Sequence, residues 1–221
     1  MKLNELRGLK YPDDFVIKFF FKNGLHNRKG RVLELGCSNG NNLMMFREYG
    51  WEINGVDISA PALADAEFNF QPPPTSPAPC RFIRHDLARG LPRVVRGHFD
   101  VILIPNVLNY LMRNEALSLL RAARRHAKPG TRVFVRTRSV RDYRHRRGQS
   151  VGGGSFRMTT DETGEKGLIN TCYRECELAD MVRNQFGVRA ASLQVFSVES
   201  ENLHGGLAVL NSDIVVWGTI R

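Results

Sequence analysis

Residues 31–40, Arg-Val-Leu-Glu-Leu-Gly-Cys-Ser-Asn-Gly, decide the fold of this chain. Residues 32–35 are apolar enough for a buried strand, a turn bounded by Gly36 and Gly40 follows, and residues 42–48 have the pattern of a helix. A glycine turn between a buried parallel strand and a helix lets a ligand lie against backbone N–H groups, and the helix N-terminus favours anionic groups. The sequence therefore predicts a nucleotide-type cofactor site.

The spacing of this turn separates the candidate cofactors. A dinucleotide fingerprint needs Gly-x-Gly-x-x-Gly, but no glycine stands between Gly36 and Gly40. A phosphate-binding loop needs Gly-Lys-Ser/Thr, and Gly40 is followed by two asparagines. The acidic Glu34 before the turn suits a ligand with a cationic end. The turn therefore disfavours NAD and ATP.

The block 32–40 resembles the first motif of class I S-adenosylmethionine-dependent methyltransferases, an acidic residue followed by x-Gly-x-Gly-x-Gly. Glu34, Gly36 and Gly40 match this motif. Ser38 stands where the middle glycine usually lies, which serine tolerates if its backbone φ is negative. Further segments are similar to later motifs of the family, in the family's order: residues 54–59, 84–87, 99–110 and 128–135.

The resemblance implies a cofactor, S-adenosylmethionine, and a product, S-adenosylhomocysteine. Asp57 would bind the ribose hydroxyls, and Asp86 would meet the adenine amino group. One carboxylate can accept both ribose hydrogen bonds, each worth about 1.5–3 kcal/mol when charge-assisted. From the residues alone, Asp57 could instead cap the next helix, although Ser59 suits that role better, and Asp86 could simply form a turn. The resemblance predicts as cofactor-binding residues Tyr11, Glu34, Gly36, Cys37, Gly40, Asn41, Asp57, Ile58, Asp86, Leu87, Pro105 and Asn106.

Strand and helix patterns alternate along most of the chain. The expected helices are 12–22, 42–48, 61–68, 114–127 and 177–185. The expected strands are 31–35, 53–57, 81–84, 101–104, 132–137, 191–198 and 212–219, with a further hairpin of 156–160 and 168–173. The alternation and the terminal hairpin predict a three-layer, doubly wound α/β fold, whose mostly parallel seven-stranded sheet has one antiparallel strand. The proline-rich segment 71–79 is expected to be an extended surface loop.

Composition sets the outer limits. The chain has 221 residues, of which 42% are hydrophobic, so we expect one domain over 1–221, with 1–30 as an N-terminal helical cap. No apolar run reaches membrane-span length, and the N-terminus lacks a signal-peptide pattern. The four cysteines form no Cys-x-x-Cys pair, which disfavours zinc or another metal and fits a reducing cytoplasm.

The net charge of +10 raises the question of nucleic-acid binding. Basic residues cluster at 121–128 and again at 136–147, but Tyr143 is the only aromatic residue in the second cluster, so the sequence predicts no base-stacking platform. A solvated helix face explains the first cluster equally well. RNA methylation therefore stays an alternative, as does a catalytically silent partner subunit with this fold.

The acceptor side is less well defined. By resemblance, residues 105–108 lie near the reacting methyl group, and they differ from the Asn/Asp-Pro-Pro-Tyr/Phe motif of amino-group nucleic-acid methylases. The favoured function is methyl transfer to a small molecule or metabolite, with no acceptor atom assigned. Residues 138–175 are expected to form an acceptor-side insertion. Within it, residues 138–170 are expected to be a mobile lid with its hinge at Gly152–Gly154, in which Phe156 and Met158 cover the acceptor. The weak catalytic candidates are Asn106, Tyr143 and His145, with Arg138 and Asp142 as further acceptor-side residues.

Overall fold

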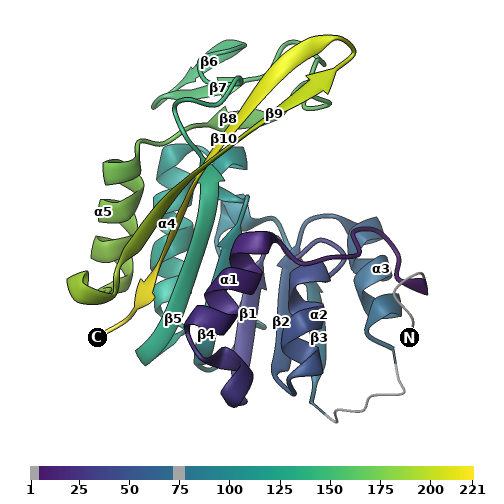
Figure 1. The fold of residues 1–221 in the computed structure, drawn as a ribbon, viewed down its shortest axis with the longest axis vertical. Coiled ribbons are helices and arrows are strands. Elements are labelled where there is room, and N and C mark those ends of the chain that lie inside the picture. The colour runs from purple at the N-terminus through teal and green to yellow at the C-terminus, as the bar shows by residue number, and fades with distance from the viewer. Residues whose placement is uncertain (1–4, 72–77) are drawn as a thin grey trace.

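The middle layer of the protein is one twisted sheet, seen in a computed structural model that describes residues 5–71 and 78–221. Its strands follow the order β3-β2-β1-β4-β5-β10-β9 (Figure 1). β10 runs antiparallel to the other six strands of this sheet, which are parallel to one another, so the predicted fold class is confirmed. The strands are β1 (Arg31–Leu35), β2 (Glu52–Asp57), β3 (Cys80–Arg84), β4 (Phe99–Pro105), β5 (Ala127–Arg138), β9 (Gln194–His204) and β10 (Leu207–Thr219).

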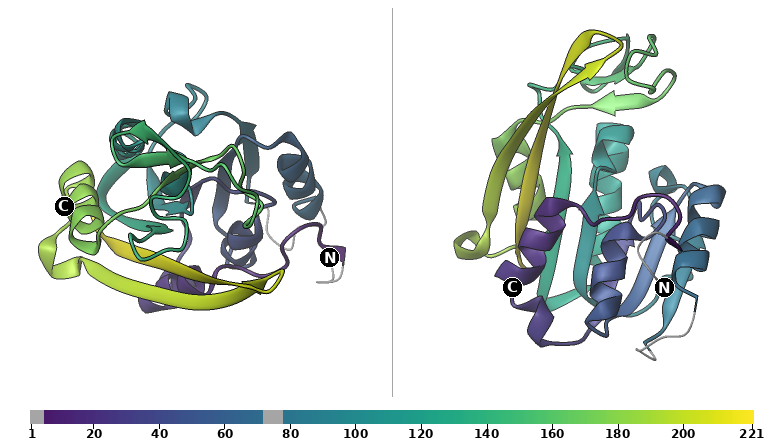
Figure 2. Two further views of the ribbon diagram at one scale, coloured as in Figure 1. Left: turned by 90° about the horizontal axis from the view of Figure 1, so that it is seen from above. Right: turned by 45° about the vertical axis from the view of Figure 1, so that its right-hand side comes forward.

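Helices cover both faces of the sheet (Figures 1 and 2). The helices α1, α2 and α3 pack on one face around a core rich in phenylalanine and tryptophan, and α4 and α5 pack on the other around an aliphatic core. The bounds are α1 (Asp14–Lys22), α2 (Asn41–Glu48), α3 (Ala60–Asn69), α4 (Arg113–Arg124) and α5 (Glu175–Phe186), with short 3-10 turns η2 (Leu25–Asn27), η3 (Leu87–Arg89), η4 (Leu108–Tyr110) and η5 (Ala190–Ser192).

Local sequence explains where these elements begin. The Ser59 hydroxyl accepts a hydrogen bond from the backbone N–H of Ala62, so Ser59 caps α3 as its sequence position suggests. Helix α4 was expected to reach residue 127 but ends at Arg124, because Ala127 already pairs with Phe99 in the sheet. Of the proline-rich segment, residues 72–77 lie outside the described residues.

The terminal hairpin is longer than the sequence predicts. Strands β9 and β10 were expected at 191–198 and 212–219, but their pairing continues to His204 and Leu207. This extension carries the hairpin past the carboxyl ends of the parallel strands (Figure 1). It therefore forms one wall above the edge where α/β sheets bind ligands.

The insertion after β5 folds into its own small sheet. Strands β6 (Gln149–Gly152), β7 (Ser155–Arg157) and β8 (Ile169–Thr171) pair antiparallel in this order and lie above the main sheet (Figure 2). The predicted hairpin is thus confirmed as β7 and β8, with shorter strands, whereas β6 was not predicted. Gly152–Gly154 join β6 to β7 in a tight turn with φ between 60° and 93°. Their expected role as a hinge stays a prediction.

Arg136 of β5 ties the N-terminal segment to the terminal hairpin. Its Nη1 lies 2.6 Å from Asp13 Oδ2, and its Nη2 lies 2.7 Å from Asp213 Oδ2 on β10. Each of the three side chains is less than a fifth exposed. Asp13 also caps α1, because its Oδ1 accepts a hydrogen bond from the backbone N–H of Phe15 at 2.8 Å.

We expect Asp13→Ala to lower the free energy of unfolding by about 2–4 kcal/mol, because it removes a helix cap and leaves Arg136 short of a partner. The matched control is Asp14→Ala. Asp14 is 78% exposed and lies 3.5 Å from Arg136, so its loss should change stability by less than about 0.5 kcal/mol. Urea unfolding followed by circular dichroism measures both; equal effects would contradict the assignment.

Candidate active site

The carboxyl ends of β1, β2 and β4 open into a pocket of about 430 Å³, named here the cofactor pocket. Its lining combines carboxylate, imidazole and amide groups with an apolar slot. The insertion contributes to one side. The lining residues are Gly36, Asp57, Ile58, His85, Asp86, Leu87, Asn106, Val107, Tyr110, Leu111, Leu168 and Ile169.

The turn after β1 needs its glycines for two reasons. Gly36 has a φ of 76°, and a Cβ placed there would lie 2.3 Å from Cγ2 of Val107, so backbone conformation and packing both exclude a side chain. Gly40 has a φ of 78°, and its Cβ would come within 2.7 Å of the Phe70 ring. Gly36 lines the pocket, whereas Gly40 is not part of the lining, so its contact with a cofactor stays a prediction.

Asp57 organises the same turn. Its Oδ2 accepts a hydrogen bond from the backbone N–H of Ser38, and its Oδ1 accepts one from Ser59, both at 2.8 Å. Ser38 has a φ of 47°, so the expectation of a negative φ is wrong: here serine adopts the left-handed conformation that glycine reaches more easily. Asp57 lines the pocket, and carboxylate oxygens can accept further hydrogen bonds.

Glu34 lies behind the turn rather than in the pocket lining. It is 1% exposed, and its Oε1 accepts a hydrogen bond of 2.6 Å from Asn42 Nδ2, while its Oε2 has no partner. Burial raises the pKa of Glu34 to about 8. Asn42 Oδ1 in turn accepts from the backbone N–H of Asp13 at 2.8 Å, so Glu34 connects β1 through α2 to the start of α1.

The segment after β3 supplies two polar groups. Asp86 lines the pocket and caps η3, accepting a hydrogen bond of 3.0 Å from the backbone N–H of Ala88. His85, which sequence reasoning missed, also lines the pocket, and its Nε2 is buried without a partner. A buried polar atom left unpaired at a pocket is expected where a ligand supplies the missing hydrogen bond. The adjacent aspartate could have signalled this histidine.

The remaining predicted cofactor residues divide into two groups. Ile58, Leu87 and Asn106 line the pocket, whereas Cys37 and Pro105 are buried and do not. Tyr11 and Asn41 are also outside the lining: the Tyr11 side chain is 68% exposed, and its backbone oxygen accepts from Asn41 Nδ2 at 2.9 Å. Direct contact of these four residues with a cofactor stays a prediction.

A second cavity of about 320 Å³, named here the polar cavity, adjoins the cofactor pocket and shares Asn106 and Tyr110 with it. Asn106, directly after β4, has a φ of 55°, a conformation asparagine tolerates. The predicted acceptor-side residues Arg138 and Asp142 also line this cavity. The residues that the sequence did not single out are Asn109, Arg136, Arg144, Val198, Ser200, Asn202, Asn211 and Asp213.

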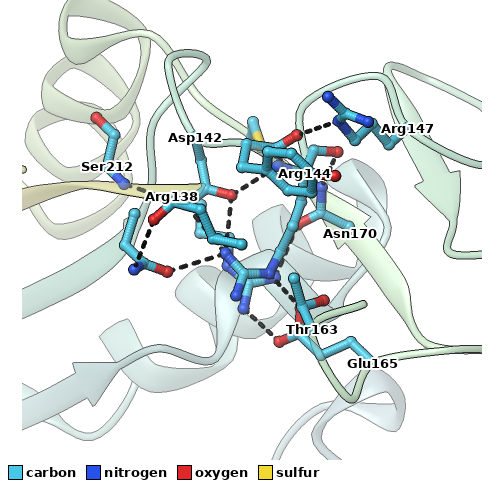
Figure 3. Close-up of polar contacts among 12 residues, drawn as sticks. Arg138, Asp142, Arg144, Arg147, Thr163, Glu165, Asn170 and Ser212 are labelled. Carbon is cyan, nitrogen blue, oxygen red and sulfur yellow. Dashed lines mark hydrogen bonds and ion pairs between the residues drawn. The ribbon is translucent and has the colours of Figure 1, made fainter. Parts of the chain in front are cut away.

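Glu165, from the loop between β7 and β8, fastens the insertion over this region (Figure 3). It forms ion pairs with Arg138 and with Arg144, the latter at 2.5 Å, and accepts a hydrogen bond of 2.7 Å from the Tyr110 hydroxyl. Burial acts to raise the pKa of Glu165, but the hydrogen bonds and charges of Arg138, Tyr110 and Arg144 together outweigh burial and hold this pKa below its usual value. The insertion is therefore anchored by charge at the pocket edge.

Other residues proposed for the acceptor side lie elsewhere. Tyr143 donates a hydrogen bond of 2.8 Å to Glu162 at the surface, and His145 lines a separate surface hollow. Neither lines the cofactor pocket or the polar cavity, so the structure does not bring them to the predicted site. Phe156 and Met158 do not line them either: the insertion reaches the cofactor pocket through Leu168 and Ile169 instead.

Comparisons with known proteins agree with this geometry. Residues 33–133 match the family model described as a methyltransferase domain. A Bacillus subtilis (strain 168) protein, YqeM, named as a methyltransferase, is 31% identical over 105 residues, which span 46% of this chain and 39% of YqeM. The chain thus matches well under half of the length of that relative.

Solved structures share the whole architecture at lower identity. An S-adenosylmethionine-dependent methyltransferase from Methanosarcina mazei has a TM-score of 0.61 at 19% identity, covering 89% of this chain and 97% of its own. The N-terminal domain of EvdMO1, solved in the presence of S-adenosylhomocysteine and D-fucose, has a TM-score of 0.64 at 20% identity. The match covers 98% of this chain and 89% of that domain's chain. The chain thus has the fold of these methyltransferases, and its residues 33–133 match a methyltransferase domain.

The described residues hold neither a metal-binding cluster nor a membrane-spanning helix. Within 5–71 and 78–221, no group of three or more histidine, cysteine, aspartate or glutamate side chains is arranged to hold a metal ion. No helix in this part of the chain is long and apolar enough to cross a membrane.

We expect Gly36→Val to abolish the binding of S-adenosylhomocysteine, because the branched side chain would collide with Val107 and strain the turn. The control is Gly24→Val, at a glycine whose φ is also positive but which has open space around it. In thermal melts, S-adenosylhomocysteine should raise the melting temperature of the parent and the control only. Equal stabilisation of Gly36→Val would contradict the turn geometry.

Burial of Glu34 also predicts a pH dependence. Its raised pKa means that the folded protein keeps the proton longer than the unfolded chain, so this residue's contribution to stability is lost as pH rises towards 8. In Glu34→Gln that loss should vanish, and its stability relative to the parent should rise by up to about 1 kcal/mol per pH unit between pH 5 and 8. Urea unfolding across this range tests the slope, with the exposed Glu48→Gln as control; parallel profiles for Glu34→Gln and parent would refute it.

Proposed function

We propose that this chain transfers a methyl group from S-adenosylmethionine to a small molecule. The observation that carries the proposal is the junction of the two cavities: Asn106 and Tyr110 line both the cofactor pocket and the polar cavity. A methyltransferase must hold donor and acceptor side by side, since much of its catalysis is positioning. Two adjoining cavities that share a wall meet this requirement.

The residues of the cofactor pocket suit the chemistry of S-adenosylmethionine. Its apolar slot, with Leu87 and Val107, can take an adenine ring, and Asp57 can accept hydrogen bonds from ribose hydroxyls. The unpaired Nε2 of His85 and the carboxylate of Asp86 offer further polar contacts. When bound, this cofactor supplies an electrophilic methyl group on a positively charged sulfur.

The protein's own part in the reaction is to orient and enclose. Tyr110 and Leu168 line the cofactor pocket and can exclude water from it. Glu165 holds Tyr110 in place by accepting a hydrogen bond from its hydroxyl. Asn106, at the junction, offers an amide that can both donate to an acceptor group and accept from it. A general base is needed only if the acceptor must lose a proton.

The distribution of charge favours a small molecule over RNA. Three arginines of the basic cluster 136–147, Arg136, Arg138 and Arg144, are mostly buried and paired with acidic residues. They are therefore not available as a surface for phosphates. The intact turn and Asp57 favour an active enzyme over a silent partner subunit. A cytoplasmic location stays a prediction.

Structural neighbours act on varied acceptors. One is a glycopeptide N-methyltransferase, MtfA, with a TM-score of 0.59 at 16% identity, covering 96% of this chain and 92% of its own. Another is the Synechocystis magnesium protoporphyrin IX methyltransferase, with a TM-score of 0.57 at 14% identity, covering 94% of this chain and 81% of its own. This variety is consistent with a small acceptor but selects none.

Calorimetric titration with S-adenosylhomocysteine tests the cofactor assignment. Asp57→Ala removes two ribose hydrogen bonds and should weaken binding by about 2–3 kcal/mol, or about 30–150-fold. Asp65→Ala, on α3 and outside the pocket lining, is the control. Labelled methyl transfer to a metabolite mixture then tests the reaction. A parent protein that binds no S-adenosylhomocysteine would refute the proposed function.

A further inference from the structure

We infer that the polar cavity binds a neutral, polyhydroxylated ring, the chemistry of a monosaccharide unit, as the methyl acceptor. This inference rests on the proposed function, because it assigns the acceptor class for the same site. It is drawn from how three strands build the cavity, how its charges are paired, and which hydrogen-bonding groups are left to face a ligand.

Alternate residues of three neighbouring strands form the main wall. On β10, Asn211 lies opposite Ser200 of β9, and Asp213 lies opposite Val198. Asp213 also pairs across to Arg138 of β5. Side chains at paired positions share a face of the sheet, so these residues form one continuous surface, and all of them line the cavity.

The same face changes character along the strands. Nearer the middle of the sheet it carries Phe134, Phe196 and Trp217, which pack together and, through Phe19 of α1, into the core. Beyond the start of α1 it becomes polar, with Arg136 at the boundary contacting the helix cap. The helix therefore covers the apolar half and leaves the polar half to line a cavity.

The charged groups of the cavity neutralise one another. Arg136 is paired with Asp13 and Asp213, as described above, and Arg138 is paired with Glu165. Arg144 lies 3.1 Å from Asp142 Oδ1 and also contacts Glu165 (Figure 3). These three arginines therefore meet four carboxylates, which leaves no surplus of positive charge for a phosphate or carboxylate ligand.

The groups that remain are suited to hydroxyls. Four asparagines and a serine line the cavity. Asn109 already accepts a hydrogen bond from Thr137, and Asn211 accepts one from Arg144. Asn106, Asn202 and Ser200 are left to face a ligand, and amides and hydroxyls both donate and accept hydrogen bonds, as a row of hydroxyl groups requires. Val198 is the only aliphatic residue of the lining, and Tyr110 its only aromatic one, so a flat apolar acceptor would leave many polar groups unpaired. A volume of about 320 Å³ lies at the small end of ligand sites, consistent with a single ring.

Saturation-transfer NMR of the parent protein with S-adenosylhomocysteine present tests the ligand class. The probes are methyl α-D-glucopyranoside as the neutral ring, D-glucuronate as its anionic counterpart and resorcinol as a small aromatic molecule. We expect saturation transfer to the glucoside and much less to the other two. A stronger response from glucuronate or resorcinol, or none from the glucoside, would overturn the inference.

A matched pair of variants on β9 tests whether the glucoside binds in the polar cavity. Asn202 is exposed and lines the cavity, whereas Gln194 is an exposed amide at the far end of the same strand. Asn202→Leu should weaken glucoside binding by about fivefold, the effect of one hydrogen bond, and Gln194→Leu should leave it unchanged. Equal affinities for the glucoside in both variants would contradict the assigned wall.

The binding of S-adenosylhomocysteine distinguishes a failure of the sugar-binding inference from a failure of the proposed function. Both variants lie outside the cofactor pocket and should keep the parent's affinity for this ligand. If the parent binds it but not the glucoside, only the acceptor class is refuted. If the parent does not bind it at all, the proposed function itself fails, whatever the sugar probes show.

Discussion

The arrangement of both cavities depends on one mostly buried cation. Arg136 of β5 holds the Asp13 carboxylate, which caps α1, and the Asp213 carboxylate, which belongs to the terminal hairpin. Losing either carboxylate would leave charge on Arg136 uncompensated, so the two ion pairs hold the start of α1 and strand β10 against β5. Arg136 therefore decides where the helix stops covering the sheet and where the polar cavity begins.

A chain of hydrogen bonds carries this order to the cofactor side. Asp13 donates its backbone N–H to Asn42, and Asn42 donates to the buried Glu34 at the end of β1. The turn that follows is held from its other side by Asp57. The two cavities are thus built on one connected polar framework.

Sequence reasoning succeeded where contacts are local. The turn around Gly36 and Gly40, the acids after β2 and β3, and the cap at Ser59 depend on neighbouring residues and on the strand–turn–helix pattern, so they could be predicted. It failed for Ser38, whose positive φ is set by Asp57 on another strand, 19 residues away. It also passed over His85, because the lack of a partner for its ring is visible only in three dimensions.

By itself, the sequence determined the order of strands and helices and the glycine turn, since periodicity and turn chemistry are written in consecutive residues. The class of cofactor followed from the resemblance of that turn and the later motifs to a known family. Only the tertiary structure formed the polar cavity. The wall of Ser200, Asn211 and Asp213 arises from strand pairing between distant segments. The fold also turned inward three arginines of the basic cluster 136–147, Arg136, Arg138 and Arg144, because each finds a carboxylate from a different element. Pairing across the fold, rather than composition, fixes what those charges can bind.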